Sequence, residues 1–138
     1  MDMAEITTQQ LQRVHRAAHA EWQRAGRELG LSHSEFEYLS AVQEQEDRLR
    51  YTDEHGQHLH DIVEALGVTK ASASTMIAKL EQQGLVLRFR CTMDARAHHF
   101  ILTEQGRARK ALGQQVYERV QAKLRAQLQE NTPERIEK

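Results

Sequence analysis

The stretch that decides the fold covers residues 58–86, and its sequence is HLHDIVEALGVTKASASTMIAKLEQQGLV. Apolar residues recur in it at steps of three and four, which is the spacing of the buried face of an α-helix. Gly67 interrupts the first such run, and Thr69 can cap the second. We therefore expect a helix–turn–helix, two helices joined by a short glycine-containing turn, over residues 59–66 and 70–83.

The segment that follows alternates between apolar and polar side chains, as a β-strand does. Residues 85–90 and 98–102 form two such runs, and a mostly polar turn at 91–96 connects them. Two strands with a short connection predict a β-hairpin. The turn carries Asp94 and Arg96, so we expect a wing with a basic tip.

Longer helices are expected before the helix–turn–helix and after the hairpin. Apolar side chains recur at helical spacing over residues 6–29 and again over 104–130. A further helix starts after Ser32, runs to about Leu49 and buries a face that begins with Phe36. The first helix carries an apolar stripe that needs a partner surface. The fold class expected is mainly α with a small β-hairpin wing.

Composition limits the class of protein. The length of 138 residues suits a single domain, residues 1–138. The net charge is −1, yet residues 70–110 hold eight basic and three acidic side chains, a local excess that can bind phosphates. The single cysteine, Cys91, excludes an intrachain disulfide. The N-terminus lacks the layout of a signal peptide, and no apolar run could span a bilayer. We expect a cytoplasmic protein with no membrane partner.

Signatures of enzymes are absent from the sequence. It contains no glycine-rich phosphate loop, no nucleophile elbow and no zinc-protease helix. We expect no enzyme and no cofactor.

Two motifs, within residues 80–107, carry a resemblance to a known family. One is the run Leu80-Glu81-Gln82-Gln83-Gly84-Leu85-Val86, which winged helices share in general. The other is Asp94-Ala95-Arg96 followed by Leu102-Thr103-Glu104-Gln105-Gly106-Arg107. With these motifs the chain resembles the MarR (multiple antibiotic resistance regulator) family. It departs from the family at His58, where serine or threonine is common, and at Cys91-Thr92-Met93, where proline and acidic residues are usual.

The resemblance implies a winged helix–turn–helix flanked by N- and C-terminal dimerisation helices. The DNA-binding lobe would cover residues 33–102, and the dimerisation helices would cover 5–30 and 104–130. The implied function is a sequence-specific transcriptional regulator, usually a repressor, that binds a near-palindromic operator in double-stranded DNA as a homodimer.

The second helix of the helix–turn–helix is the candidate recognition helix. Small hydroxyl side chains and one base crowd its first turns, and such side chains let the backbone approach a major groove. The resemblance implies that Arg96 enters the minor groove and that Asp94 orients it, while Arg88 and Arg90 would contact phosphates. The expected DNA-binding residues are Thr69, Lys70, Ala71, Ser72, Ser74, Thr75, Lys79, Arg88, Arg90, Asp94 and Arg96.

The resemblance also implies a small-molecule effector, since relatives bind phenolic or aromatic anions between the dimer helices and the DNA-binding lobe. The candidate effector residues are Arg16, His19, Trp22 and Tyr38. Trp22 equally suits the core of a dimer interface.

Three alternatives stay open on sequence grounds. Histidines at 15, 19, 55, 58 and 60 have spacings that can bind zinc, but no set of four ligands is complete. We expect surface or capping histidines and no metal. Cys91, near several arginines, is either a redox sensor or an incidental small residue. The chain could also be a winged-helix protein-interaction module that binds no DNA, against which the basic wing argues.

Overall fold

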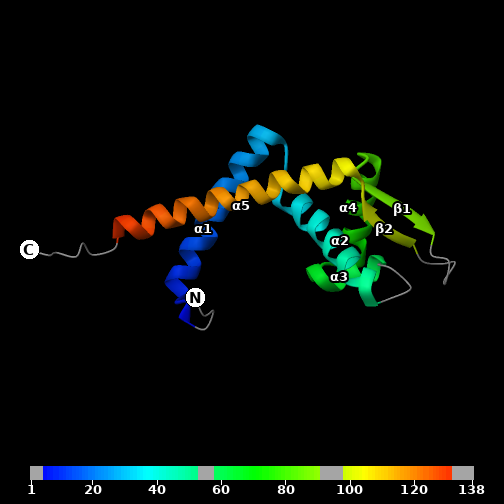
Figure 1. Ribbon diagram of the computed structural model, residues 1–138, viewed down its shortest axis with the longest axis horizontal. Helices are drawn as coiled ribbons and strands as arrows, with labels where there is room; N and C mark the ends of the chain where they lie inside the picture. The colour runs from blue at the N-terminus through cyan, green and yellow to red at the C-terminus, as the bar shows by residue number, and fades with distance from the viewer. Residues whose placement is uncertain (1–4, 53–57, 91–97, 132–138) are drawn as a thin grey trace, which may run out of the picture. The chain divides into compact units, whose positions relative to one another are not determined.

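The computed structural model of the chain describes residues 5–52, 58–90 and 98–131 (Figure 1). In chain order the elements are α1 (Thr8–Leu29), α2 (His33–Thr52), α3 (Leu59–Leu66), α4 (Lys70–Gln82), β1 (Val86–Arg90), β2 (His98–Leu102) and α5 (Glu104–Asn131). This order confirms the predicted fold class, mainly α with one β-hairpin. None of the described helices combines the length and the apolar character that a bilayer crossing requires.

The chain folds as two compact units. One unit comprises residues 33–112, and the other combines residues 1–32 with 113–138. The lobe expected at residues 33–102 falls inside the first of these units. The segments expected to dimerise lie largely in the second, although α5 begins in the first.

The unit of residues 33–112 has one apolar core, formed where α2 packs against α3, α4 and β2. Ile62, Ile77 and Leu80 are fully buried in it, and burial of each such side chain contributes roughly 1.5–3 kcal/mol. Ile77 faces inward, and Met76 packs at the edge of the core. Val68 is only partly buried and lies in the turn between α3 and α4.

The wing strands pair antiparallel, and their register sorts the side chains onto two faces. One face carries Val86 opposite Leu102 and Arg88 opposite Phe100. Val86, Phe100 and Leu102 are buried, so this face lies on the core. Residues of the other face, including Leu87 at 52% exposure, are largely accessible.

A compact junction joins the end of α4, the start of β1 and the start of α5. Gly84 ends the turn after α4 at φ +78°, a left-handed conformation that suits glycine. The Thr103 hydroxyl donates to the Gly84 carbonyl at 2.7 Å and accepts from the Gly106 N–H at 3.0 Å. The Thr103 N–H donates to the Leu85 carbonyl at 3.0 Å. One threonine therefore ties three elements together.

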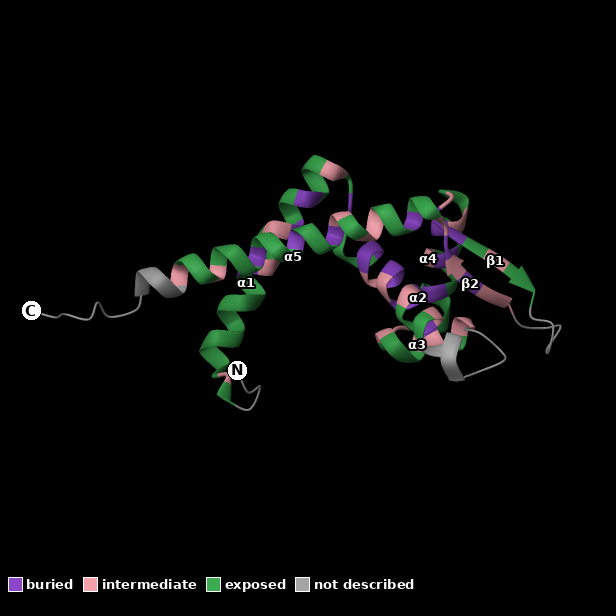
Figure 2. Cartoon of the chain, in the orientation of Figure 1, coloured by how far each residue is buried: buried purple, intermediate pink, exposed green. Residues whose placement is uncertain are grey.

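In the other unit, α1 starts at Thr8 rather than at the expected residue 6, because Thr7 caps it through a hydrogen bond from the Gln10 N–H at 3.0 Å. The buried side chains of α1 are Ala17, Trp22 and Ala25, and the Trp22 ring meets the Tyr117 ring edge-on at 5.6 Å. The first turns of α1, residues 8–16, are exposed (Figure 2). Leu11 there is 58% exposed.

Candidate nucleic-acid interface

Helix α4 presents its predicted contact residues to solvent. Ala73, Ile77 and Leu80 are fully buried, which fixes the rotation of the helix about its axis. The six predicted contact residues within this helix are all exposed; they are Lys70, Ala71, Ser72, Ser74, Thr75 and Lys79. The structure thus places all six on the surface of one helix, outside its buried stripe.

Thr69 and Ser72 also stabilise the start of α4. The Thr69 hydroxyl accepts a hydrogen bond from the Ser72 N–H at 3.0 Å and donates to the Ser72 hydroxyl at 2.9 Å. Both residues remain exposed. Loss of such a cap typically costs about 1 kcal/mol, so substitutions here would change stability as well as any contact with a ligand.

The two arginines of β1 have different surroundings. The Arg88 Nε lies 3.2 Å from a Glu81 carboxylate oxygen, and the Arg88 guanidinium lies 5.3 Å from the centre of the Phe100 ring. These contacts hold Arg88 against its own lobe. Arg90 is exposed at the end of the strand and is the better placed of the two to reach a phosphate. Asp94 and Arg96, the expected wing tip, lie outside the described residues.

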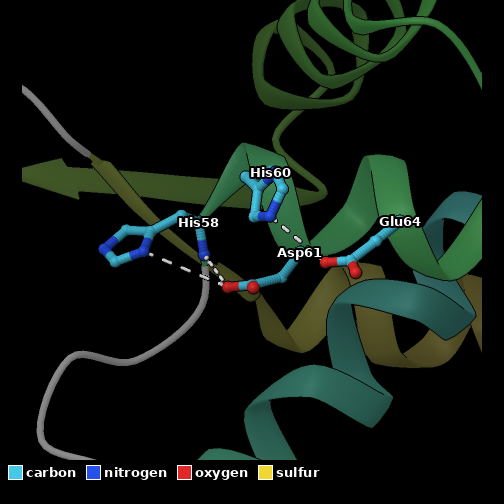
Figure 3. Close-up of polar contacts among 4 residues, drawn as sticks. All are labelled: His58, His60, Asp61 and Glu64. Atoms are coloured by element: carbon cyan, nitrogen blue, oxygen red, sulfur yellow. Dashed lines mark hydrogen bonds and ion pairs between the residues drawn. The ribbon is translucent and has the colours of Figure 1, made fainter.

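Two histidines, His58 and His60, lie at the start of α3 (Figure 3). His58 takes the N-cap position, and its N–H donates to an Asp61 carboxylate oxygen at 2.8 Å. His60 lies 3.2 Å from the Glu64 carboxylate. The His58 ring is 4.9 Å from the ring of His99 on β2. Within the three described ranges, no group of three or more potential metal ligands comes together, and both Cys91 and His55 fall outside those ranges.

The sequence patterns did not single out His98, His99 or Phe100 as site residues. The signal was present, because alternation along a strand places His98 and Phe100 on one face and His99 on the other. The sequence could not indicate which element packs against this strand, because α3 contacts β2 only in the folded structure.

The predicted effector residues are divided between the two units. Arg16 and His19 are exposed on α1, whereas Trp22 is buried against Tyr117. Tyr38 belongs to the core of the other unit at 4% exposure, and burial raises the pKa of its phenol above the ordinary value. The grouping of these four residues around a ligand therefore stays a prediction.

Comparison with known proteins supplies the family. The model of the MarR family matches residues 31–98, which span α2, α3, α4 and β1 and end at the first residue of β2. These residues therefore form a MarR-family domain. Comparison with curated protein sequences gave no significant match.

Solved structures show the same fold at low sequence identity. The complex of S. aureus MepR with DNA superposes with a TM-score of 0.67 at 21% identity, covering 90% of this chain and 86% of that one. Streptococcus pneumoniae FabT in complex with DNA gives 0.63 at 18% identity, with coverage of 96% and 85%. The transcriptional repressor CouR, bound to a 23-mer DNA duplex, gives 0.65 at 23% identity, with coverage of 90% and 84%.

The MarR-type motif after the wing has a structural explanation in this chain. Thr103 and Gly106 of Leu102-Thr103-Glu104-Gln105-Gly106-Arg107 form the junction of α4, β1 and α5 described above. Arg107 closes the same turn, because its guanidinium donates to the Leu102 carbonyl at 3.1 Å. The motif therefore holds the wing to the lobe.

Proposed function

We propose that this MarR-family chain is a DNA-binding transcriptional regulator that acts as a homodimer, usually as a repressor, on a near-palindromic operator. The observation that carries the proposal is the solvent-exposed surface of α4, where small hydroxyl side chains and Lys70 lie outside a fully buried stripe. The likeness to MepR, FabT and CouR, each solved with DNA, supports it.

The chemistry of this face suits a major groove. Serine and threonine hydroxyls both donate and accept hydrogen bonds, and their small size admits the backbone of a helix close to base edges. Lys70 at the first turn of α4 and Arg90 on the wing strand β1 add positive charges that can contact backbone phosphates of the DNA. Wing residues Asp94 and Arg96 would extend the contact into the minor groove, as the family resemblance implies.

Dimerisation supplies the second recognition helix. Leu11 and Val14 are 58% and 41% exposed on α1, and Tyr117 is 37% exposed on α5. A second copy of the chain would cover these apolar side chains. Two α4 helices would then enter successive major grooves about 34–36 Å apart. A small-molecule effector would relieve repression by changing the spacing of the two lobes.

Salt-dependent binding tests the proposal directly. We would select genomic fragments on the purified protein and measure the affinity of a selected duplex by fluorescence anisotropy from 50 to 300 mM salt. Lys70→Gln and Arg90→Gln should each weaken binding and reduce the slope of log K against log salt by about one per protomer.

Lys123→Gln is the matched control, because Lys123 is an exposed lysine of α5 outside the proposed surface. Affinity and slope equal to those of this control in both variants would overturn the assignment of α4 and β1. A wild-type protein that binds no duplex at 50 mM salt would instead favour the protein-interaction module.

A further inference from the structure

A pocket with an acidic lining lies between α2 and α3, within the unit of residues 33–112. Its volume is about 400 Å³, which falls in the range of small-molecule sites. The lining residues are Glu44 and Gln45 on α2 and Asp61, Glu64 and Ala65 on α3. Three of these side chains are carboxylates and none is basic, so the pocket favours a cation.

Two helices bring the three carboxylates together. Asp61 and Glu64 are three residues apart on α3 (Figure 3), a spacing that makes them neighbours on the helix surface. Glu44 comes from α2, which packs against α3. The sequence around them has the same sign of charge, because residues 35–69 hold nine acidic and only two basic side chains.

The carboxylates of α3 keep acceptor positions for a ligand. One oxygen of Asp61 accepts from the His58 N–H at 2.8 Å, and one oxygen of Glu64 lies 3.2 Å from the His60 ring. Each carboxylate has two oxygens and about four acceptor positions. The local contacts therefore orient both groups without using up their capacity to accept hydrogen bonds.

Gln45 supplies a second and independent sign of a ligand. It is 7% exposed, yet within the described ranges its side-chain amide forms no hydrogen bond. Polar side chains buried to this degree are nearly always hydrogen-bonded. Gln43, two residues earlier, shows the ordinary case, since its amide lies 3.3 Å from Glu46 and 2.9 Å from Asp47 and donates to both. Gln45 lines the acidic pocket instead, where its oxygen can accept a hydrogen bond from a bound cation.

The spacing of the acceptors selects the kind of cation. In the part of the chain that the structure describes, no three carboxylate, histidine or cysteine side chains come together as the ligands of one metal ion. Acceptors spread around about 400 Å³ suit positive charges that are set apart along one ligand. A primary ammonium group offers one charge and three N–H donors. Ala65, the apolar residue of the lining, suits the methylene chain between two such groups.

We propose that this acidic pocket binds a free linear diamine or polyamine. Its ammonium groups pair with the carboxylates, and one of them donates to the side-chain oxygen of Gln45. A lysine side chain of a partner protein has the same chemistry but brings only one charge, whereas the pocket offers three carboxylates. A free ligand with two or more charges is therefore the better match. Such binding needs no DNA, so it goes beyond the proposed function and is tested separately from it.

Calorimetry without DNA tests the class of ligand. The probe is 1,6-diaminohexane at pH 7 and constant ionic strength, and the comparators are 1-aminohexane, hexamethonium and Mg²⁺. Hexamethonium carries the same two charges on the same six-carbon chain but has no N–H donors. We expect the diamine to bind at least about fivefold tighter than each comparator, because charge-assisted hydrogen bonds are the strong ones. Equal affinities of the diamine and hexamethonium, or tighter binding of Mg²⁺, would overturn the proposal.

A further titration separates the two sources of ammonium. Nα-acetyl-lysine amide represents the lysine of a partner protein and should bind no tighter than 1-aminohexane. If it binds as tightly as the diamine, the second charge contributes nothing and the assignment to a free polyamine is wrong.

A double variant tests the carboxylates. Glu44→Gln/Glu64→Gln removes two charges at exposed positions, so the fold should be retained, and it should weaken diamine binding at least about tenfold. The matched control is Glu37→Gln/Asp47→Asn, which removes two charges from α2 outside the pocket. Glu37 pairs with a histidine four residues earlier, as Glu64 does. The control should bind within twofold of the wild type, and the same loss in both variants would mean a general charge effect and would overturn the site.

Gln45→Leu separates a role in binding from a role in the fold. Leucine has a similar size but no polar group. Because a buried polar group without a partner destabilises a fold, the Tm of the ligand-free variant should rise, while its affinity for the diamine should fall at least about threefold. Unchanged affinity would show that the amide does not contact the ligand and would overturn its place in the site.

Discussion

Substitution of Gly106 by alanine should destabilise the protein, although alanine has a higher helix propensity than glycine. Gly106 lies in the first turns of α5 and is buried. A Cβ built there would overlap the carbonyl oxygen of Leu85 and come within 3.1 Å of the carbonyl carbon, closer than real Cβ contacts allow without a shift. Both obstacles are backbone atoms, so no side chain can rotate away. The start of α5 and the start of β1 would have to separate.

The expected magnitude follows from the contacts that this separation affects. The hydrogen bond from the Thr103 N–H to the Leu85 carbonyl, now 3.0 Å, would weaken, at a cost of about 1 kcal/mol. Overpacking of a well-packed site typically costs about 1–3 kcal/mol. Alanine returns up to about 1 kcal/mol through its higher helix propensity. We therefore expect the free energy of unfolding to fall by about 2 kcal/mol.

Thermal and urea unfolding measure this loss, which corresponds to a decrease in Tm of about 4–8 °C for a protein of this size. Gly26→Ala is the matched control, because its Cβ would meet only the Leu31 carbonyl oxygen at 3.9 Å, an ordinary contact, inside α1. That variant should gain up to about 1 kcal/mol from propensity alone. A Gly106→Ala protein as stable as Gly26→Ala would refute the reasoning.

Three further outcomes are expected. Thr103→Val removes the 2.7 Å hydrogen bond to the Gly84 carbonyl while it keeps the shape, so the free energy of unfolding in urea should fall by about 1–3 kcal/mol and Thr103→Ser should restore most of it. Leu11→Asp, on the exposed stripe of α1, should shift the protein toward monomer in analytical ultracentrifugation, whereas Gln12→Asp should not. Burial raises the pKa of Tyr38 in the folded state. The unfolded state therefore loses its proton first, and this contribution to stability, present at neutral pH, is lost above roughly pH 10. Tyr38→Phe should accordingly lose less stability than the wild type between about pH 9 and 11, and parallel curves would contradict the shift.

The helices could be predicted from the sequence because local chemistry determines them. Gly30 and Gly67 follow the ends of α1 and α3 and adopt φ of +65° and +66°, a backbone conformation that glycine reaches without strain. Ile62 and Leu80 mark inward faces that the helical period already indicates. Boundaries and buried faces of this kind need no knowledge of distant residues.

The surroundings of individual site residues could not be predicted, since they depend on contacts between elements. Arg88 was expected to reach a phosphate, and its own sequence neighbourhood gives no sign that Glu81 and Phe100 hold it. Tyr38 is a candidate effector residue together with residues of α1, yet it lies in the core of the unit formed by residues 33–112. A hollow lined by residues of α3, α4 and the wing strands arises from the same tertiary packing.

The residues that close the fold differ from the exposed residues of α4, and this difference explains which properties the sequence reveals. Two residues of the motif that follows the wing, Thr103 and Gly106, are specific in type because they meet backbone atoms at short distances. The residues of α4 outside its buried stripe, such as Ser74 and Lys70, are exposed in the free protein, so stability restricts their type less than it restricts Thr103 and Gly106. Side chains that can vary without loss of the fold are the ones through which a regulator can acquire a new operator. The fold can therefore be read from residues whose type the packing restricts, whereas the operator that we propose would depend on exposed residues that the fold leaves free to change.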